Sequence, residues 1–269
     1  MAGDTRSFKL GKAVTVTAPD EIAEQVAAAV SRMLGGPKRR SRAAAGTNDR
    51  LSAERIVAVA VEQMREHGYD AVTMRSIARE LGTGPASLYA HVANRAELDQ
   101  LVVAWVCGQW QIPDPDPERW DDQLRASLVD LLDLYRANPG VARCTLGMIP
   151  LQPSLLLVTE RLIALLKAGG VSDQQCAWFV DVSALYVASV AVEEDIWRER
   201  QRGQGAGENL TEDAVVAEVR TVFQSLPAEH FPLLSTMADT MTSGSGDDRF
   251  RFGVDLLVGG LRALGRADQ

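Results

Sequence analysis

Apolar residues recur every three or four positions along most of this chain, as expected of amphipathic helices. Between Leu51 and Gly68, for example, Ile56, Ala60 and Met64 fall on one helical face. No convincing alternation of apolar and polar residues, which would indicate a strand, occurs outside the N-terminal tail. The pattern therefore predicts an all-α fold. From Arg95 onward, it predicts helices at Arg95–Gln111, Trp120–Ala137, Gly140–Leu146, Pro153–Ala168, Ser172–Gln201, Thr211–Gln224 and Asp247–Leu264.

The stretch Thr73–Arg95 predicts two short helices, a tight turn between them, and the start of a third helix. Thr73 is a good N-cap for the first helix. Gly82 ends that helix, because glycine enters the left-handed region without steric cost. Thr83 can cap a second helix that has Pro85 in its first turn. This is a helix-turn-helix, although a plain helical hairpin shares the same local features.

The third helix opens with Asn94–Glu97, a capping box. The pattern R-I-x-x-x-A-x-x-x-x-x-x-x-G-Y-D-A-x-T-M-R-x-I-A-x-E-L-G, followed by S-L-Y-x-H-V-x-N-R-x-E-L, resembles the TetR family of bacterial repressors from about Leu51 to Leu101. The resemblance implies a DNA-binding head in which Arg75 and the Pro85–Ser87 edge face bases. The DNA-contacting residues that it implies are Thr73, Arg75, Thr83, Gly84, Pro85, Ala86, Ser87, Tyr89, His91, Asn94 and Arg95, with Arg95 in the place of the family's phosphate-binding cation.

Charge divides the chain unevenly. Residues Pro37–Glu97 hold ten Lys/Arg and seven Asp/Glu, a balance of +3, within a chain of net charge −8. The rest holds 28 − 10 = 18 basic and 36 − 7 = 29 acidic residues, a balance of −11. A basic head on an acidic body suits phosphate contact at one end. Arg39 and Arg40, in the basic cluster Lys38–Arg42, belong either to an arm that contacts DNA or to a solvated tail.

The predicted organisation has three parts. Residues 1–50 form an extension with a possible helix at 19–34, residues 51–97 form the head, and residues 98–269 form a helical body. Leu146–Pro150, Val192–Asp195 and Phe250–Leu261 resemble the C-terminal domain of the tetracycline-repressor branch, which implies a homodimer built on two helices from each copy. The implied interface residues are Val182, Leu185, Gly253, Val254, Leu257, Val258 and Leu261, unless these faces simply fill the core of one protomer.

The same resemblance implies a ligand pocket in the body. Aromatic and methionine side chains with a few polar groups suit a small organic molecule. In that branch a drug–magnesium chelate is held through histidines, whereas this chain has Thr145 and Trp110 at the matching positions. We therefore expect no metal, no cofactor, and a neutral or cationic organic effector. The candidate ligand-binding residues are Trp105, Gln109, Trp110, Thr145, Leu146, Met148, Trp178, Tyr186 and Glu193; each one alone is more typical of ordinary core, and their placement as a group on the helices that line the family's pocket favours a ligand site.

Together these features predict a homodimeric, cytoplasmic repressor that a small organic ligand releases from a palindromic DNA operator. The alternative is a DNA-binding regulator with no small-molecule effector. An enzyme is not expected, because the sequence contains no nucleophile elbow, phosphate-binding glycine loop or metal-ligand cluster. The cysteines Cys107, Cys144 and Cys176 are scattered. No apolar run approaches the roughly 18 residues of a membrane-spanning helix, so we expect no membrane partner.

Overall fold

The computed structural model describes residues 51–203 and 211–267. Within these residues all regular structure is helical and there are no strands, which confirms the all-α prediction. The predicted helix at 19–34 and the basic residues Arg39 and Arg40 lie outside the described residues.

The N-terminal part is a compact helical unit, and its helices are α2 (Ala53–His67), a short 3₁₀ turn η1 (Tyr69–Ala71), α3 (Met74–Glu80), α4 (Pro85–Leu88) and α5 (Arg95–Cys107). Ile56, Met64, Ile77 and Leu88 are completely buried where α2, α3 and α4 meet. The predicted apolar face of the first helix is thus the face that forms this core. We call α2, η1, α3 and α4 the head.

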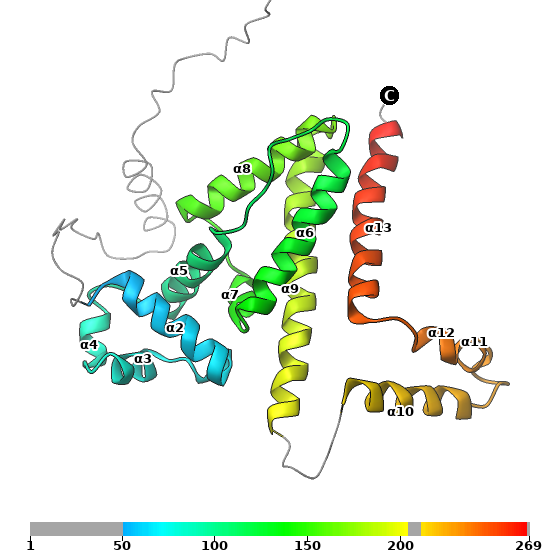
Figure 1. Ribbon diagram of the computed structural model, residues 1–269, viewed down its shortest axis with the longest axis horizontal. Coiled ribbons are helices and arrows are strands. Elements are labelled where there is room, and N and C mark those ends of the chain that lie inside the picture. Colours follow the sequence, from blue (N-terminus) through cyan, green and yellow to red (C-terminus); the bar gives the residue numbers. More distant parts are fainter. Residues whose placement is uncertain (1–50, 204–210, 268–269) are drawn as a thin grey trace, which may run out of the picture.

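The remaining helices form the body, and they are α6 (Trp120–Ala137), α7 (Val141–Thr145), α8 (Pro153–Ala168), α9 (Asp173–Gly203), α10 (Glu212–Ser225), α11 (Pro232–Thr236), α12 (Ala238–Met241) and α13 (Gly246–Ala267). Helix α9 runs through the middle of the body and contacts α6, α7, α8 and α13 (Figure 1). The sequence predicted the long helices of the body, α6, α8, α9, α10 and α13, to within three residues at each end. It missed η1, α11 and α12, which have too few residues to show a periodicity.

Helix α5 ends at Cys107, four residues before the predicted end at Gln111. Gly108 follows it, and the Pro113–Pro117 segment cannot continue a helix. The early end matters for the body, because Gln109 and Trp110 are no longer on the helix that carries Trp105.

Helix α9 is long and apolar enough to cross a bilayer by length and composition alone, with a mean hydropathy of 1.5. The sequence pattern predicted no such apolar run. The apolar composition is explained on one side by the four helices that pack against α9. On the other side Trp178, Val182 and Leu185 remain exposed, at a spacing that places them on one helical face.

Helix α13 requires a correction to the predicted dimer interface. Val254, Val258 and Leu261 are buried in the protomer itself, where α13 packs on α6 and α9. Gly253 is in close contact with Tyr186 of α9, because a Cβ atom there would overlap the tyrosine hydroxyl. These four residues therefore hold the protomer together. The exposed apolar residues of α13 are instead Phe252, Leu256 and Leu264.

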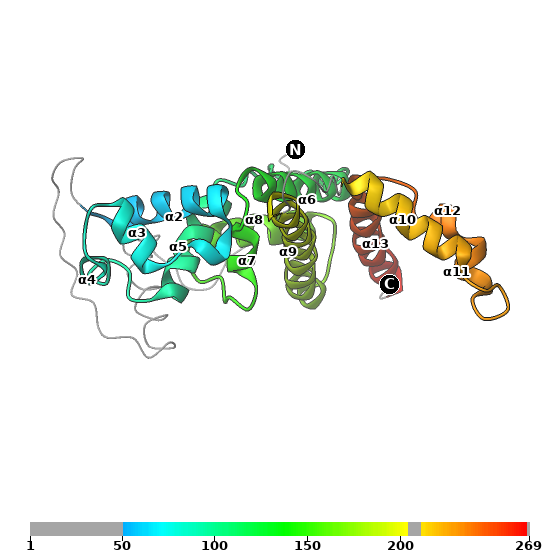
Figure 2. The same ribbon diagram turned by 90° about the horizontal axis from the view of Figure 1, so that it is seen from below.

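Helices α10, α11 and α12 form an arm that packs mainly among its own members. The arm projects from the body at the end farthest from the head (Figure 2). Its exposed side chains include Val222, Phe231, Leu233 and Met241. A protruding element with this much exposed apolar surface is typical of a protein that associates with another chain.

Candidate functional site

The helix-turn-helix is held by local hydrogen bonds. The Thr73 hydroxyl accepts from the Ser76 N–H at 3.0 Å, and the Ser76 hydroxyl accepts from the Thr73 N–H at 2.8 Å, a capping box. Gly82 has φ +63°, and the Thr83 N–H donates to the Ala78 carbonyl at 2.9 Å. The predicted turn glycine therefore has the left-handed conformation that the turn needs.

The second helix of the motif is shorter than predicted. The N-cap of α4 is Gly84 without a side-chain cap, so the prediction that Thr83 caps it is wrong. Hydrogen-bonded turns continue the chain from Leu88 to Val92. At the start of α5 the Asn94 side chain accepts from the Glu97 N–H as predicted, but Glu97 accepts from Ala93 rather than from Asn94.

The outer edge of the head is open to solvent. The residues exposed along it are Thr73, Arg75, Gly84, Pro85, Ala86, Ser87, Tyr89 and Asn94, whereas Thr83 and His91 are partly buried. Leu88 points the other way, into the core. Arg75 of α3 and Pro85–Ser87 at the start of α4 are therefore open to solvent, as the predicted DNA contacts require.

Arg95 lies between the head and the body. Its guanidinium donates to Asp99 Oδ1 through Nε at 2.7 Å, donates to the Val72 carbonyl, and lies 4.2 Å from the centre of the Tyr69 ring. The hydroxyl of Tyr69 also donates to Asp99, at 2.9 Å. Burial and the neighbouring Asp99 raise the pKa of Tyr69 to about 12, so this hydroxyl keeps its proton.

Helix α7 completes this junction. Arg143 forms an ion pair with Asp70 of the head at 3.1 Å, and the Cys144 thiol donates to Asp99 Oδ1 at 3.6 Å. The N–H of Gly140, just before α7, donates to Asp195 Oδ2 of α9 at 2.7 Å. Burial raises the pKa of Asp195. The head is therefore attached to the body through both α5 and α7.

A cavity of about 360 Å³ opens between α5, α6, α7, α8 and α9. Its walls are mostly apolar, as in sites for small organic molecules. Trp110 closes one side, with its indole N–H held by the Ser127 carbonyl at 3.0 Å. Its lining includes Val103, Cys107, Trp110, Leu128, Leu131, Tyr135, Thr145, Met148, Leu155, Val158, Thr159, Leu162, Asp181, Ala184 and Leu185.

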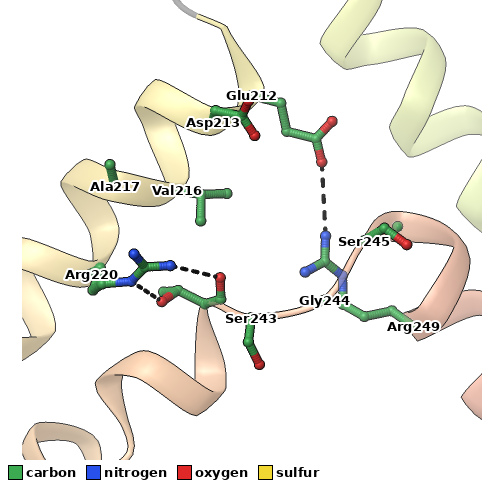
Figure 3. Close-up of a pocket in the computed structure, with 11 residues that line it drawn as sticks. Glu212, Asp213, Val216, Ala217, Arg220, Ser243, Gly244, Ser245 and Arg249 are labelled. Atoms are coloured by element: carbon green, nitrogen blue, oxygen red, sulfur yellow. Dashed lines mark hydrogen bonds and ion pairs between the residues drawn. The ribbon is translucent and has the colours of Figure 1, made fainter.

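A second hollow, of about 460 Å³, lies where the arm meets the start of α13 (Figure 3). Arg220 donates to the Thr242 hydroxyl at 2.8 Å and to the Thr242 carbonyl at 3.3 Å, and Arg249 lies 3.9 Å from Glu212. Both arginines are thus engaged within the protein. This polar, open hollow has no apolar wall comparable to that of the first cavity.

Two family models match the chain. Residues 56–99 match the model of bacterial regulatory proteins, tetR family, and residues 112–264 match the tetracyclin repressor-like C-terminal domain. The second match alone spans more than half of the chain. The chain belongs to the TetR family. It is therefore a DNA-binding transcriptional regulator, as the sequence pattern indicated.

Individual TetR-family proteins are similar over most of their length. The structure of ActR from Streptomyces coelicolor in complex with actinorhodin is 35% identical, with a TM-score of 0.71, over 80% of this chain and 99% of that chain. The HTH-type transcriptional repressor DrrR1 of Streptomyces coeruleorubidus is 28% identical over 225 residues, 81% of this chain and 80% of that protein. The Escherichia coli tetracycline repressor protein class C is 25% identical over 218 residues, 80% of this chain and 93% of that protein.

The structure brings only some of the predicted ligand residues to the cavity between α5 and α9. Trp110, Thr145 and Met148 line it, and so does Leu185, which we had predicted for the dimer interface. The remaining candidates do not line the cavity. Trp105, Gln109, Leu146, Trp178 and Glu193 are exposed, and Tyr186 stacks on Phe250 and donates to its carbonyl at 3.1 Å.

Two features of the cavity and junction were missed in the sequence. Tyr135 and Cys107 form a buried polar pair in the cavity wall, with the thiol donating to the hydroxyl at 3.7 Å. Burial raises the pKa of the Cys107 thiol to about 12, so it is not a reactive thiolate. Asp99 could have been found from its spacing, because Arg95 and Asp99 are four residues apart on one helix. Within the described residues no group of three or more His, Cys, Asp or Glu side chains could hold a metal ion.

Arg95, predicted to contact phosphate, is paired within the protein, and we therefore expect its main role to be structural. Arg95→Ala should lower stability by about 1–3 kcal/mol, because Asp99 loses its ion-pair partner and the Val72 carbonyl loses a donor. It should leave the salt dependence of DNA binding almost unchanged. Arg75→Ala, on the exposed edge, should instead flatten that dependence by about one counterion per half-site. Thermal denaturation and DNA affinity over a salt series give both values, and the reverse pattern would restore Arg95 as the phosphate contact.

Proposed function

We propose that this protein is a homodimeric repressor that binds a palindromic operator and releases it when a small organic molecule occupies the cavity between α5 and α9. The observation that carries this proposal is the position of α5 and α7. Both helices contribute to the cavity wall, through Val103 and Thr145, and both hold the head, through Arg95 and Arg143. A ligand that displaces either helix therefore acts on the junction directly.

The dimer rests on apolar surface that one protomer leaves uncovered. Trp178, Val182 and Leu185 form a stripe on α9, and Phe252, Leu256 and Leu264 form a stripe on α13. We call these the α9 stripe and the α13 stripe. Between Leu256 and Leu264, added Cβ atoms at Gly259 or Gly260 would meet nothing within 4 Å, so another helix can approach closely there. Two copies related by a two-fold axis would bury both stripes.

A dimer also suits the DNA. A single recognition helix contacts few bases, whereas two heads about 34–36 Å apart read two half-sites one helical turn apart. Ligand-induced movement of α5 and α7 would change that separation. A tenfold loss of operator affinity requires only about 1.4 kcal/mol of coupling between cavity and head.

The effector is proposed to be organic and aromatic rather than a metal chelate. The cavity has apolar walls of Leu, Val, Met and Trp side chains, and its volume suits a drug-sized ring system. One similar protein, ActR, has been solved in complex with actinorhodin. Thr145 and Trp110 line the cavity, and neither side chain is a good ligand for a divalent cation.

The experiment begins with operator selection. Fragments of genomic DNA retained by the purified protein should share an inverted repeat, and one dimer should bind each repeat. An aromatic library should then contain a compound that raises the thermal stability of the protein and frees the DNA. Retained fragments without an inverted repeat would argue against the paired heads. If no ligand of the cavity weakens operator binding, the protein is a regulator without a small-molecule effector.

A further inference from the structure

The cavity between α5 and α9 has a single charged group in its lining, the carboxylate of Asp181. No lysine, arginine or histidine is among the described residues that line it. Asp181 is exposed, and its carboxylate has no hydrogen bond or ion pair with another described residue. It differs in this respect from Asp173 on the same helix, which is paired with Lys167 at 2.8 Å.

Most other polar groups of the wall are already engaged. The Trp110 indole donates to the Ser127 carbonyl at 3.0 Å, and the Ser183 hydroxyl donates to the Val180 carbonyl at 3.3 Å. The Thr145 hydroxyl donates to the Ala142 carbonyl at 2.7 Å. These groups satisfy the protein's own backbone. The carboxylate of Asp181 therefore remains the strongest polar group that the lining offers to a ligand.

Asp181 is also well placed for an ion pair. It lies on the exposed side of α9 with Ala177 and Ala184, which are exposed lining residues of the same cavity. This group marks the mouth. A ligand could bury an apolar ring system among the inner walls and keep a charged group at the mouth, where desolvation costs little.

We propose that the effector is an amphiphilic cation, with an aromatic body in the cavity and a protonated amine paired with Asp181. This inference rests on the proposed function, since it takes the cavity to be the effector site. An organic anion would meet no counter-charge in the lining. It would also be repelled by the part of the chain outside Pro37–Glu97, whose formal charge is 18 − 29 = −11.

Three acridines of one ring size test the charge preference in the absence of DNA. They are 9-aminoacridine, a cation at neutral pH; acridine, which is neutral; and acridine-9-carboxylate, an anion. Binding is followed by probe fluorescence and by quenching of tryptophan fluorescence. The wild-type protein should bind the cation about fivefold more tightly than the neutral compound, as expected of an ion pair open to water on one side. It should bind the anion most weakly.

Two variants assign the preference to one carboxylate. Asp181→Asn should abolish the difference between cation and neutral compound while leaving the affinity for acridine unchanged. Asp130→Asn removes the same charge from an exposed position of α6 outside the cavity, and it should keep the preference. Equal affinities in the wild type, or a preference that survives in Asp181→Asn, would overturn the proposal.

Two further outcomes separate this inference from the proposed function. If the wild type binds all three acridines with equal affinity, the amine contact is refuted and the cavity remains the effector site. Failure of all three probes to bind would count against both. The carboxylate of Asp181 has one alternative partner, an arginine of a second copy of the chain. Sedimentation tests this alternative. If Asp181→Asn dissociates the dimer and the cation preference persists, the carboxylate serves the interface and the proposal is wrong.

Discussion

Changing Leu256 to glutamate should convert the protein from a dimer into folded monomers that no longer hold operator DNA. Leu256 is 60% exposed in the protomer and lies in the α13 stripe. The protomer therefore tolerates a carboxylate there, but a two-fold interface would bury two of them without partners. Loss of the second head should weaken operator binding at least about a hundredfold, because the second half-site is no longer held at high effective concentration.

Val258→Glu provides the contrast. Val258 is completely buried between α13 and its neighbours, so the substitution should destabilise the protomer itself. Ala126→Glu, on the exposed side of α6, controls for the added charge and should change neither the dimeric state nor the stability of the protomer. Light scattering, thermal denaturation and operator affinity distinguish the three variants. A Leu256→Glu protein that remains dimeric at micromolar concentration would show that the interface lies elsewhere.

Filling the cavity should separate effector binding from DNA binding. Val158 lies on α8, is half-buried, and lines the cavity. In Val158→Trp the indole would occupy space that the effector's ring system needs, which should weaken effector binding at least about tenfold. Helix α8 carries none of the contacts between head and body described above. Operator affinity should therefore stay within about twofold of the wild type, giving a repressor that cannot be induced.

Ala164→Trp is the matched control, because it adds the same side chain to the outward face of the same helix. It should bind both effector and operator normally. Calorimetry with an effector found by library screening, together with operator binding by fluorescence anisotropy, measures the two affinities. Normal effector affinity in Val158→Trp would place the effector outside this cavity.

The sequence predicted the elements whose signals are local. The caps at Thr73 and Asn94 and the left-handed Gly82 follow from residue chemistry within one turn of chain, and the structure has all three. Helix α13 shows where such reasoning stops. It is apolar both along Val254 and Val258 and along the α13 stripe. Periodicity cannot say which face meets α6 and α9, so the buried face was mistaken for the interface.

The cavity was less predictable for a related reason. Trp105 and Trp110 were expected to act together on one helix, but α5 ends between them. Trp110 turns into the cavity wall, whereas Trp105 stays exposed. Tyr135 and Asp181 have no distinguishing sequence signal, because a cavity wall depends on how five helices are placed in space. The pairing of Arg95 with the Val72 carbonyl could not be predicted for the same reason, since Val72 is 23 residues away in the chain.

The central claim is that occupancy of the cavity and occupancy of the operator oppose each other. The most direct measurement titrates the wild-type protein with effector in the presence and absence of saturating operator, and with operator in the presence and absence of saturating effector. Thermodynamic linkage requires both affinities to fall by the same factor. We predict a factor of about ten or more in each direction. Affinities that remain unchanged in both titrations would contradict the account, because the cavity would then have no connection to the head.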